Sequence, residues 1–326
     1  PVPSAKQACF DVRGRDSVIR LPPNRRSDVL TAFAIVTDGL VYAAYLFLVA
    51  VGLTLIFGVM KILNVTHGSF YAFGAYGAAT AAGIWFDRGL PDAGGFLFMA
   101  LFAMAIGLLI GIIIERGTLR FVYGRDEVVV VLVTYAIFLI LEDVIVLIWG
   151  PRSYAAYQPM VAAGSIDVGD LTLSIYDIGL VVLAGVVAAA GRWALKYTRY
   201  GRLLTVVIFD RETAAAYGIN VTVVYTVTFL IGAMLGALGG AVMAPKISVT
   251  LGIGVEVIVL AFAVVAIGGM GSVEGALIGA LIVGISRAAA VHLVPQLELF
   301  VIYAVMALVL GFRPYGLFSQ VQPRKI

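Results

Sequence analysis

A patterned polar segment, residues 196–220, separates two long apolar stretches of the chain. Within it, Glu212 stands beside Asp210 and Arg211, three alanines follow, and Gly218 comes near the end. An acidic residue near the start of a short helix and a glycine after its end are typical helix-terminus signals. Charges of both signs beside so slim a helix suit docking to another protein. We interpret the segment as a socket gripped by a cytoplasmic motor and expect its docking residues to be Arg202, Asp210, Arg211, Glu212, Ala214 and Gly218.

A second polar cluster, at 58–68, interrupts a long apolar stretch and contains Lys61, Asn64, Thr66 and His67. Backbone groups left unpaired inside a bilayer are costly, so a polar break is tolerated only where protein or a watery cavity covers it. Transporters place such breaks beside the substrate, and ionisable residues at membrane depth are functional candidates. We expect the four polar residues to line a substrate pathway. A loop at the membrane surface, with Lys61 and His67 among lipid head groups, is the open alternative.

A third break is rich in glycine, with four glycines among the eight residues Gly268–Gly275. Each would weaken a helix by roughly 1 kcal/mol relative to alanine. We interpret the break as a discontinuous segment at mid-membrane beside the pathway, and a tight turn between two helices is the alternative. The expected pathway residues here are Gly268, Gly269, Gly271 and Ser272.

Sequence signatures of catalysis and of bound cofactors are missing from the chain. It contains no phosphate-binding Gly-x-x-x-x-Gly-Lys-Ser/Thr loop, no His-Glu-x-x-His pair and no Gly-x-Ser-x-Gly elbow. The single Cys9 excludes a disulfide within the chain and a cysteine-based metal site. We therefore expect no cofactor, no metal site and no enzymatic activity in this chain.

Composition identifies an integral membrane protein. Of the 326 residues 62% are hydrophobic and 13% charged, whereas soluble domains have about 45–50% apolar and about 25% charged residues. The apolar stretches are continuous and many reach the ~20 residues that a membrane helix needs, which excludes a barrel. We expect an all-α protein with about eight or nine transmembrane or half-membrane helices, at 33–60, 66–86, 96–115, 128–149, 174–195, 222–244, 255–270, 273–291 and 297–312.

The net charge of +3 lies entirely in a polar arm, residues 1–31, which carries six basic and three acidic residues. The remainder is balanced, so nucleic-acid binding is unsupported. We divide the chain into this arm, a membrane domain at 32–318 and a tail at 319–326.

Orientation follows from the basic residues of short loops, which favour the cytoplasm. The loops 116–127 and 196–221 are both basic and are expected there, which places 150–173 outside. Counting back three crossings from 116–127 puts the basic arm outside, against the same rule. Either the arm is external, or 58–68 is a re-entrant turn that makes no crossing.

Five motifs occur in an order that resembles the permease subunits of branched-chain amino-acid ABC importers. The resemblance covers roughly 38–318, with two departures: Thr213 replaces an alanine, and Glu274 stands where the family usually has proline. The motifs are Gly52-Leu-Thr-Leu-Ile-Phe-Gly58, Asn64-Val-Thr-His-Gly68, Asp210-Arg-Glu-Thr-Ala-Ala-Ala-Tyr-Gly-Ile-Asn220, Gly268-Gly-Met-Gly-Ser272 and Phe312-Arg-Pro-Tyr-Gly-Leu-Phe318.

The resemblance implies an ABC importer permease fold in the lipid of a bacterial inner membrane. It also implies a second related permease, two ATP-binding subunits that hold ATP and Mg inside, and an extracytoplasmic substrate-binding protein. The cargo would be a small polar solute, branched-chain amino acids above all, although relatives carry urea, amides or other small organic acids. In this view the segment around Glu212 carries the movement of the ATP-binding subunits into the helices.

Two other classes of protein remain open from the sequence. An ion-coupled secondary transporter of amino acids or small organic solutes also uses broken helices, but it leaves the patterned segment 196–220 unexplained. A scaffold or receptor subunit explains the apolar helices but not the polar breaks.

Overall fold

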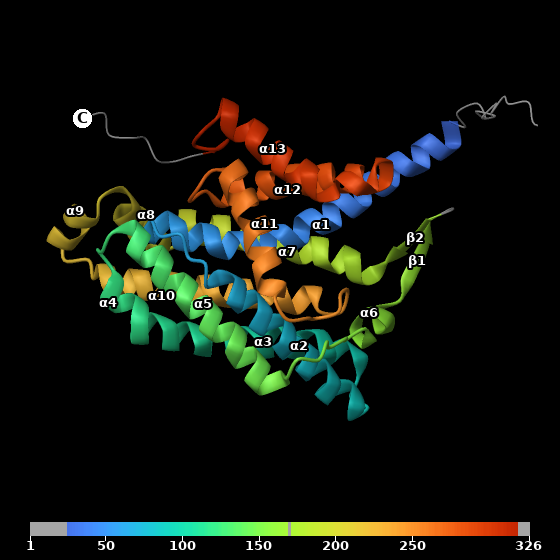
Figure 1. The fold of residues 1–326 in the computed structure, drawn as a ribbon, viewed down its shortest axis with the longest axis horizontal. Helices are drawn as coiled ribbons and strands as arrows, with labels where there is room; N and C mark the ends of the chain where they lie inside the picture. Colours follow the sequence, from blue (N-terminus) through green and yellow to red (C-terminus); the bar gives the residue numbers. More distant parts are fainter. Residues whose placement is uncertain (1–24, 169–170, 319–326) are drawn as a thin grey trace, which may run out of the picture.

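The computed structural model describes residues 25–168 and 171–318, and these form a layered bundle of helices (Figure 1). Nine long apolar helices occur in the described residues, as the composition predicts. They are α1 (Arg25–Met60), α2 (His67–Asp87), α3 (Asp92–Ile114), α5 (Glu127–Trp149), α7 (Ile175–Tyr197), α10 (Val221–Met243), α11 (Ile253–Gly268), α12 (Val273–Leu293) and α13 (Glu298–Phe312).

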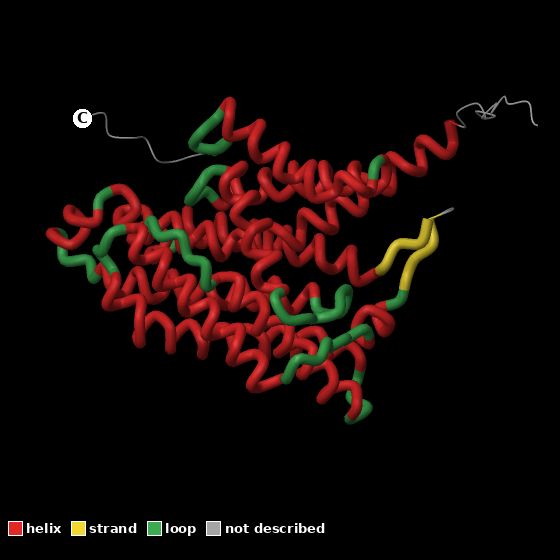
Figure 2. The backbone as a smooth tube through the Cα atoms, in the orientation of Figure 1, coloured by secondary structure: helices red, strands yellow, loops and turns green. Residues whose placement is uncertain are grey.

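Short elements lie between the long helices (Figure 2). A π-helical turn at Glu115–Leu119 continues α3 into α4 (Arg120–Val122). The other short elements are α6 (Gln158–Ala163), the antiparallel strands β1 (Ser165–Val168) and β2 (Leu171–Ser174), α8 (Arg199–Phe209), α9 (Arg211–Ala216) and a 3-10 turn at Pro295–Leu297.

Seven helical segments of the described chain are long and apolar enough to cross a membrane, and α11 is a shorter apolar helix. This confirms the expected all-α integral membrane fold with full and partial spans. The arm expected at 1–31 overlaps α1, since residues 25–31 are already helical. Residues 1–24 and the tail 319–326 lie outside the described residues.

The bundle has two ends, which we name by their short elements. The hairpin end holds β1 and β2, and the α8–α9 end holds α4, α8 and α9 (Figure 1). Helix α1 starts at the hairpin end and finishes at the α8–α9 end, where Gly58 packs against Gly271. The described start of α1 is therefore at the opposite end from 196–221, as one of the two sequence-based alternatives requires.

The turn at 61–66 re-enters the bundle after α1. The Thr66 hydroxyl donates to the carbonyl oxygen of Thr134 at 2.9 Å, and Thr134 lies seven residues inside α5. At a rise of 1.5 Å per residue, the turn reaches about 10 Å below the start of α5. Helix α2 then completes the crossing, so 58–68 is both a re-entrant turn and part of a crossing.

A second turn, at 244–252, enters from the hairpin end after α10. The Gly252 N–H donates to the Glu142 carboxylate at 3.2 Å, and Glu142 lies seven residues before the end of α5. This turn therefore reaches a similar depth of about 10 Å from the other side. The unit of α1, turn and α2 is thus repeated in inverted orientation by α10, turn and α11, an arrangement typical of transporters.

The helices that follow the two re-entrant turns, α2 and α11, meet at a glycine pair. A Cβ on Gly68 would lie 2.4 Å from the Gly254 carbonyl oxygen, and one on Gly254 would lie 2.8 Å from that of Gly68. Beside them, a Cβ on Gly52 would lie 2.6 Å from the Gly232 carbonyl oxygen, at the crossing of α1 and α10. Small residues permit this close packing of backbones, which drives helix association where lipid removes the hydrophobic effect.

Candidate functional site

Helices α8 and α9 form an exposed ledge at the α8–α9 end of the bundle. Their inner face is held by Leu204, Val207 and Ala214, which are all buried. Their outer face exposes Phe209 by 74% and Tyr217 by 82%. Neither helix is among the segments that are long and apolar enough to cross a membrane. An exposed apolar surface rimmed by charge is typical of a protein interface.

Helix α9 begins and ends as the sequence predicts. The Asp210 carboxylate accepts the N–H groups of Glu212 and Thr213, both at 3.0 Å. Gly218 follows the helix with a φ of +79°, and its N–H donates to the Ala215 carbonyl oxygen. Capping and a left-handed glycine together fix both ends of a helix too short to be stable alone.

The predicted docking residues have different environments on the ledge. Arg202, Arg211 and Glu212 are exposed and available to a partner. The Arg211 guanidinium lies 5.6 Å from the centre of the Tyr225 ring, a cation–π distance. Ala214 is fully buried, so the close-docking surface proposed for the three alanines falls to the other two.

Tyr200 joins the ledge to α10. Its hydroxyl donates to the Val224 carbonyl oxygen at 3.0 Å and lies 3.0 Å from the Thr228 hydroxyl. Burial raises the pKa of Tyr200 above its usual range, so the phenol stays neutral at any physiological pH. These contacts tie α8 to α10, a long helix of the bundle.

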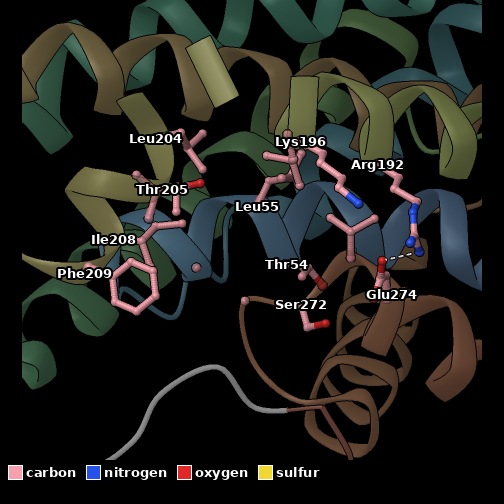
Figure 3. A pocket seen from close by; sticks show the side chains of 15 residues that line it. Thr54, Leu55, Arg192, Lys196, Leu204, Thr205, Ile208, Phe209, Ser272 and Glu274 are labelled. Atoms are coloured by element: carbon pink, nitrogen blue, oxygen red, sulfur yellow. Dashed lines mark hydrogen bonds and ion pairs between the residues drawn. The ribbon is translucent and has the colours of Figure 1, made fainter. Parts of the chain in front are cut away.

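A cavity of about 330 Å³ opens between the ledge and the ends of α1, α7 and α12 (Figure 3). It brings two of the predicted regions together, because Thr205 and Phe209 of the ledge line it with Gly271 and Ser272 of the glycine turn. Opposite them, Arg192 of α7 forms an ion pair with Glu274 of α12.

The glycine break is a tight turn at the α8–α9 end. Helix α11 ends at Gly268 and α12 begins at Val273, with Gly269 and Gly271 at φ values of +105° and +90°. The prediction of an unwound segment at mid-membrane is therefore wrong for Gly268–Gly275. The re-entrant turn next to α11 lies before its first residue, at 244–252. Ser272 caps α12 by accepting the Gly275 N–H at 3.0 Å.

The fifth motif, Phe312–Phe318, holds the glycine turn in place. The N–H groups of Leu317 and Phe318 donate to the carbonyl oxygens of Ile267 and Gly268, at 3.0 and 2.9 Å. A Cβ on Gly316 would lie 2.5 Å from the Gly269 Cα. The segment after α13 thus satisfies carbonyl groups that the end of α11 would otherwise leave unpaired.

Of the polar residues predicted at 58–68, Lys61, Asn64 and Thr66 lie in the re-entrant turn, and His67 begins α2. Lys61 has a φ of +55° and is partly exposed, whereas Asn64, Thr66 and His67 are buried. The His67 Nε2–H donates one hydrogen bond to the Val49 carbonyl oxygen at 2.9 Å. These three side chains pack inside the bundle in this conformation, so their place on a pathway stays a prediction.

The sequence analysis left two charged contacts unidentified. Arg192 and Glu274 pair across 82 positions of sequence, and no local pattern links them. Glu142 of α5 accepts the Gly252 N–H at the start of α11. A carboxylate suits the N-terminus of a helix. The sequence did not reveal this contact because Glu142 and Gly252 are 110 positions apart.

The fold and site define a multi-pass membrane protein with paired re-entrant turns and an exposed ledge formed by α8 and α9. Residues 35–310 match the family described as branched-chain amino acid transport system, permease component. The chain belongs to this family of ABC importer permease subunits, which confirms the resemblance drawn from the five motifs.

Curated relatives cover nearly the whole chain. A high-affinity branched-chain amino acid transport permease, LivH of Escherichia coli, is 29% identical over 89% of this chain and 95% of its own length. BraD of Pseudomonas aeruginosa, with the same description, is 26% identical over 89% and 96%. The solved structure of PsaBC from Streptococcus pneumoniae in complex with Fab covers 88% and 94%, with 11% identity and a TM-score of 0.47. The family and the spanning helices together place the chain in the inner membrane as a multi-pass protein.

Proposed function

We propose that this permease takes up branched-chain amino acids, driven by ATP that two partner subunits bind with Mg and hydrolyse. The supporting observation is the ledge of α8 and α9, whose outer face exposes apolar side chains next to the glycine turn. The printed descriptions of the relatives supply the cargo class.

In this proposal the α8–α9 end is cytoplasmic and the ATP-binding subunits grip Phe209, Tyr217 and the charged rim. Their closure pushes α8, and Tyr200 passes the displacement to α10. On the other side of the cavity, the Arg192–Glu274 pair joins α7 to the glycine turn. The ledge therefore contacts two parts of the bundle that can move relative to each other, as alternating access requires.

A second related permease and an external binding protein complete the proposed assembly. Helix α5 exposes Leu132, Leu139 and Leu147 on one face, and the same helix carries the exposed carboxylate of Asp143. A carboxylate at membrane depth is costly against lipid. We therefore assign this face of α5 to the neighbouring permease and the pathway between the two subunits.

The experiment is uptake of labelled leucine into vesicles that contain the chain, its partner permease, the ATP-binding subunits and the binding protein. Uptake is expected to require enclosed ATP and to persist when a protonophore removes the proton gradient. Uptake that needs a gradient, with no ATP-binding subunit present, would instead identify an ion-coupled secondary transporter. Absence of uptake, with a complete and folded complex, would leave only a scaffold.

A further inference from the structure

A second cavity, of about 270 Å³, opens near the hairpin end of the bundle, where α1, α7, α10 and α12 converge. It is separate from the cavity beside the ledge, and the two share no lining residue. Neither the sequence motifs nor the docking ledge accounts for it.

Charges of both signs reach this cavity from four different segments. Lys246, in the turn after α10, pairs with Asp177 in the first turn of α7. His292 Nε2 of α12 lies 2.8 Å from the Asp38 carboxylate of α1. Arg287, one turn earlier on α12, also lines the cavity. Convergence of so many charged groups on one hollow is typical of a ligand site.

The environment of Arg287 fixes its position. Its guanidinium lies 3.9 Å from the centre of the Tyr42 ring and pairs with Glu298 at the start of α13. Tyr42 in turn contacts Tyr45 edge to face, with ring centres 5.5 Å apart. The cation therefore lies over the Tyr42 ring, which Tyr45 supports edge to face, and is held in place on both sides.

The rest of the lining is aliphatic, from Val41, Leu180, Met243 and Val291. An aliphatic wall beside fixed charges of both signs matches a small molecule that has a carboxylate, an ammonium group and an apolar side chain. We infer that this cavity binds such a zwitterion, with Lys246 and Arg287 facing its carboxylate and Asp38 and Asp177 facing its ammonium group. The inference rests on the proposed function, because it gives the permease its own site for an amino acid.

Exchange of partners makes binding energetically accessible. The Lys246 and Asp177 side chains are 21% and 26% exposed, so their ion pair is partly solvated. Solvent that reaches the pair screens its attraction and lets each side chain exchange its partner. When a zwitterion enters, its carboxylate replaces Asp177 at Lys246 while its ammonium group takes Asp177, and no charge is left unpaired. The site therefore accepts a ligand with both charges and disfavours one that carries a single charge.

The same pair of charges occurs in the head group of phosphatidylethanolamine. The test therefore uses the assembled importer in nanodiscs without that lipid, and in matched nanodiscs that contain it. Binding of labelled leucine is measured by equilibrium dialysis in the absence of the binding protein. Leucinamide, which lacks the carboxylate, and 4-methylpentanoate, which lacks the ammonium group, serve as competitors. Leucine is expected to compete at least tenfold better than either.

The variants Lys246→Gln and Asp177→Asn are expected to weaken leucine binding at least tenfold. Because either change leaves a partner unpaired, the double variant K246M/D177L removes both charges and should bind equally poorly while assembling normally. Arg88→Gln and Asp87→Asn change exposed charges between α2 and α3, outside this cavity, and should leave the affinity unchanged.

Equal affinity in all variants, or equal competition by the two single-charge analogues, would overturn the inference. If phosphatidylethanolamine displaces leucine and co-purifies only when Lys246 and Asp177 are present, the zwitterion site stands and its ligand is the lipid. Uptake from the binding protein is measured with the same preparations. Normal uptake without direct leucine binding would refute this site alone, and absent uptake would refute the proposed function.

Discussion

The carboxylate of Glu274 pairs with the guanidinium of Arg192, which joins the first turn of α12 to the end of α7. Both side chains are more than half exposed, at 56% and 61%, so the pair adds only about 0–1 kcal/mol to stability. Its importance is positional, because it closes one side of the cavity that separates the glycine turn from the docking ledge (Figure 3). Glu274 stands where the family usually has proline, and in this chain it forms an ion pair with Arg192.

Reversing one charge of this pair is expected to reduce transport more than stability. In Glu274→Arg, two cations face each other, so α7 and α12 separate at the cavity and ATP-driven uptake should fall several-fold. The reciprocal double change, R192E/E274R, should restore most of it. Uptake and melting temperature are measured on the same preparations. A double variant no better than the single ones would show that the pair does not position the turn.

Substitutions in the glycine turn are expected to block transport. Gly271 has a φ of +90°, and its Cβ would lie 2.9 Å from the Gly58 Cα, so Gly271→Val meets both strain and a backbone. The left-handed conformation alone costs about 1–2 kcal/mol. Gly185→Val on α7 is the control, because a Cβ there meets nothing within 4 Å. Wild-type uptake by the Gly271 or Gly269 variants would reduce the turn to a passive connection.

The crossing of α2 and α11 predicts a pair of opposite outcomes within α2. Gly68→Ala would place a methyl group against the Gly254 backbone, and overpacking of this kind costs about 1–3 kcal/mol. Gly83→Ala meets open space and should be neutral or stabilise the helix by up to ~1 kcal/mol. Thermal unfolding followed by size-exclusion chromatography distinguishes them. Equal melting temperatures would contradict the close crossing.

Substitutions at the two ends of α9 are expected to uncouple ATP hydrolysis from leucine uptake. Gly218→Val forces a branched side chain into a φ of +79°, whereas Gly218→Asn retains most function because asparagine tolerates that region. Glu212→Ala should leave expression intact and separate ATP hydrolysis from leucine uptake. The ratio of ATP consumed to leucine transported is the measurement, and it should rise in Gly218→Val and Glu212→Ala. Unchanged ratios in both would remove the coupling assignment.

Sequence periodicity was sufficient to predict the ranges of the helices but not the depth at which they begin and end. The stretch expected at 66–86 is observed at His67–Asp87, because a continuous apolar run needs no partner to be recognised. The glycine turn was wrongly expected at mid-membrane. Glycine lowers helix stability equally at any depth, so the glycines show where the helix breaks but not how deep the break lies. Depth was set by α5, whose Thr134 and Glu142 hold the two re-entrant turns.

Contacts between distant residues could not be predicted from one sequence. The hairpin of β1 and β2 formed within a loop because its strands pair with each other outside the apolar layer. The charges of the second cavity come from four segments, and each by itself is an ordinary polar residue near a helix end. By contrast, the helix start near Glu212 and the helix end at Gly218 were predicted, because both residues act on the same six-residue helix, although the cap at Asp210 was not foreseen.

The central claim is that the ledge of α8 and α9 receives force from an ATP-binding subunit. With Cys9 changed to serine, the chain has no other cysteine, so single cysteines can be placed at Phe209, at Tyr217 and, as a control at the hairpin end, at Tyr157. Cross-linking in inner-membrane vesicles should join the first two positions to the ATP-binding subunit and leave the third unlinked. Labelling of Phe209 and Tyr217 positions by an impermeant reagent from outside intact cells, with no cross-link to that subunit, would contradict the account.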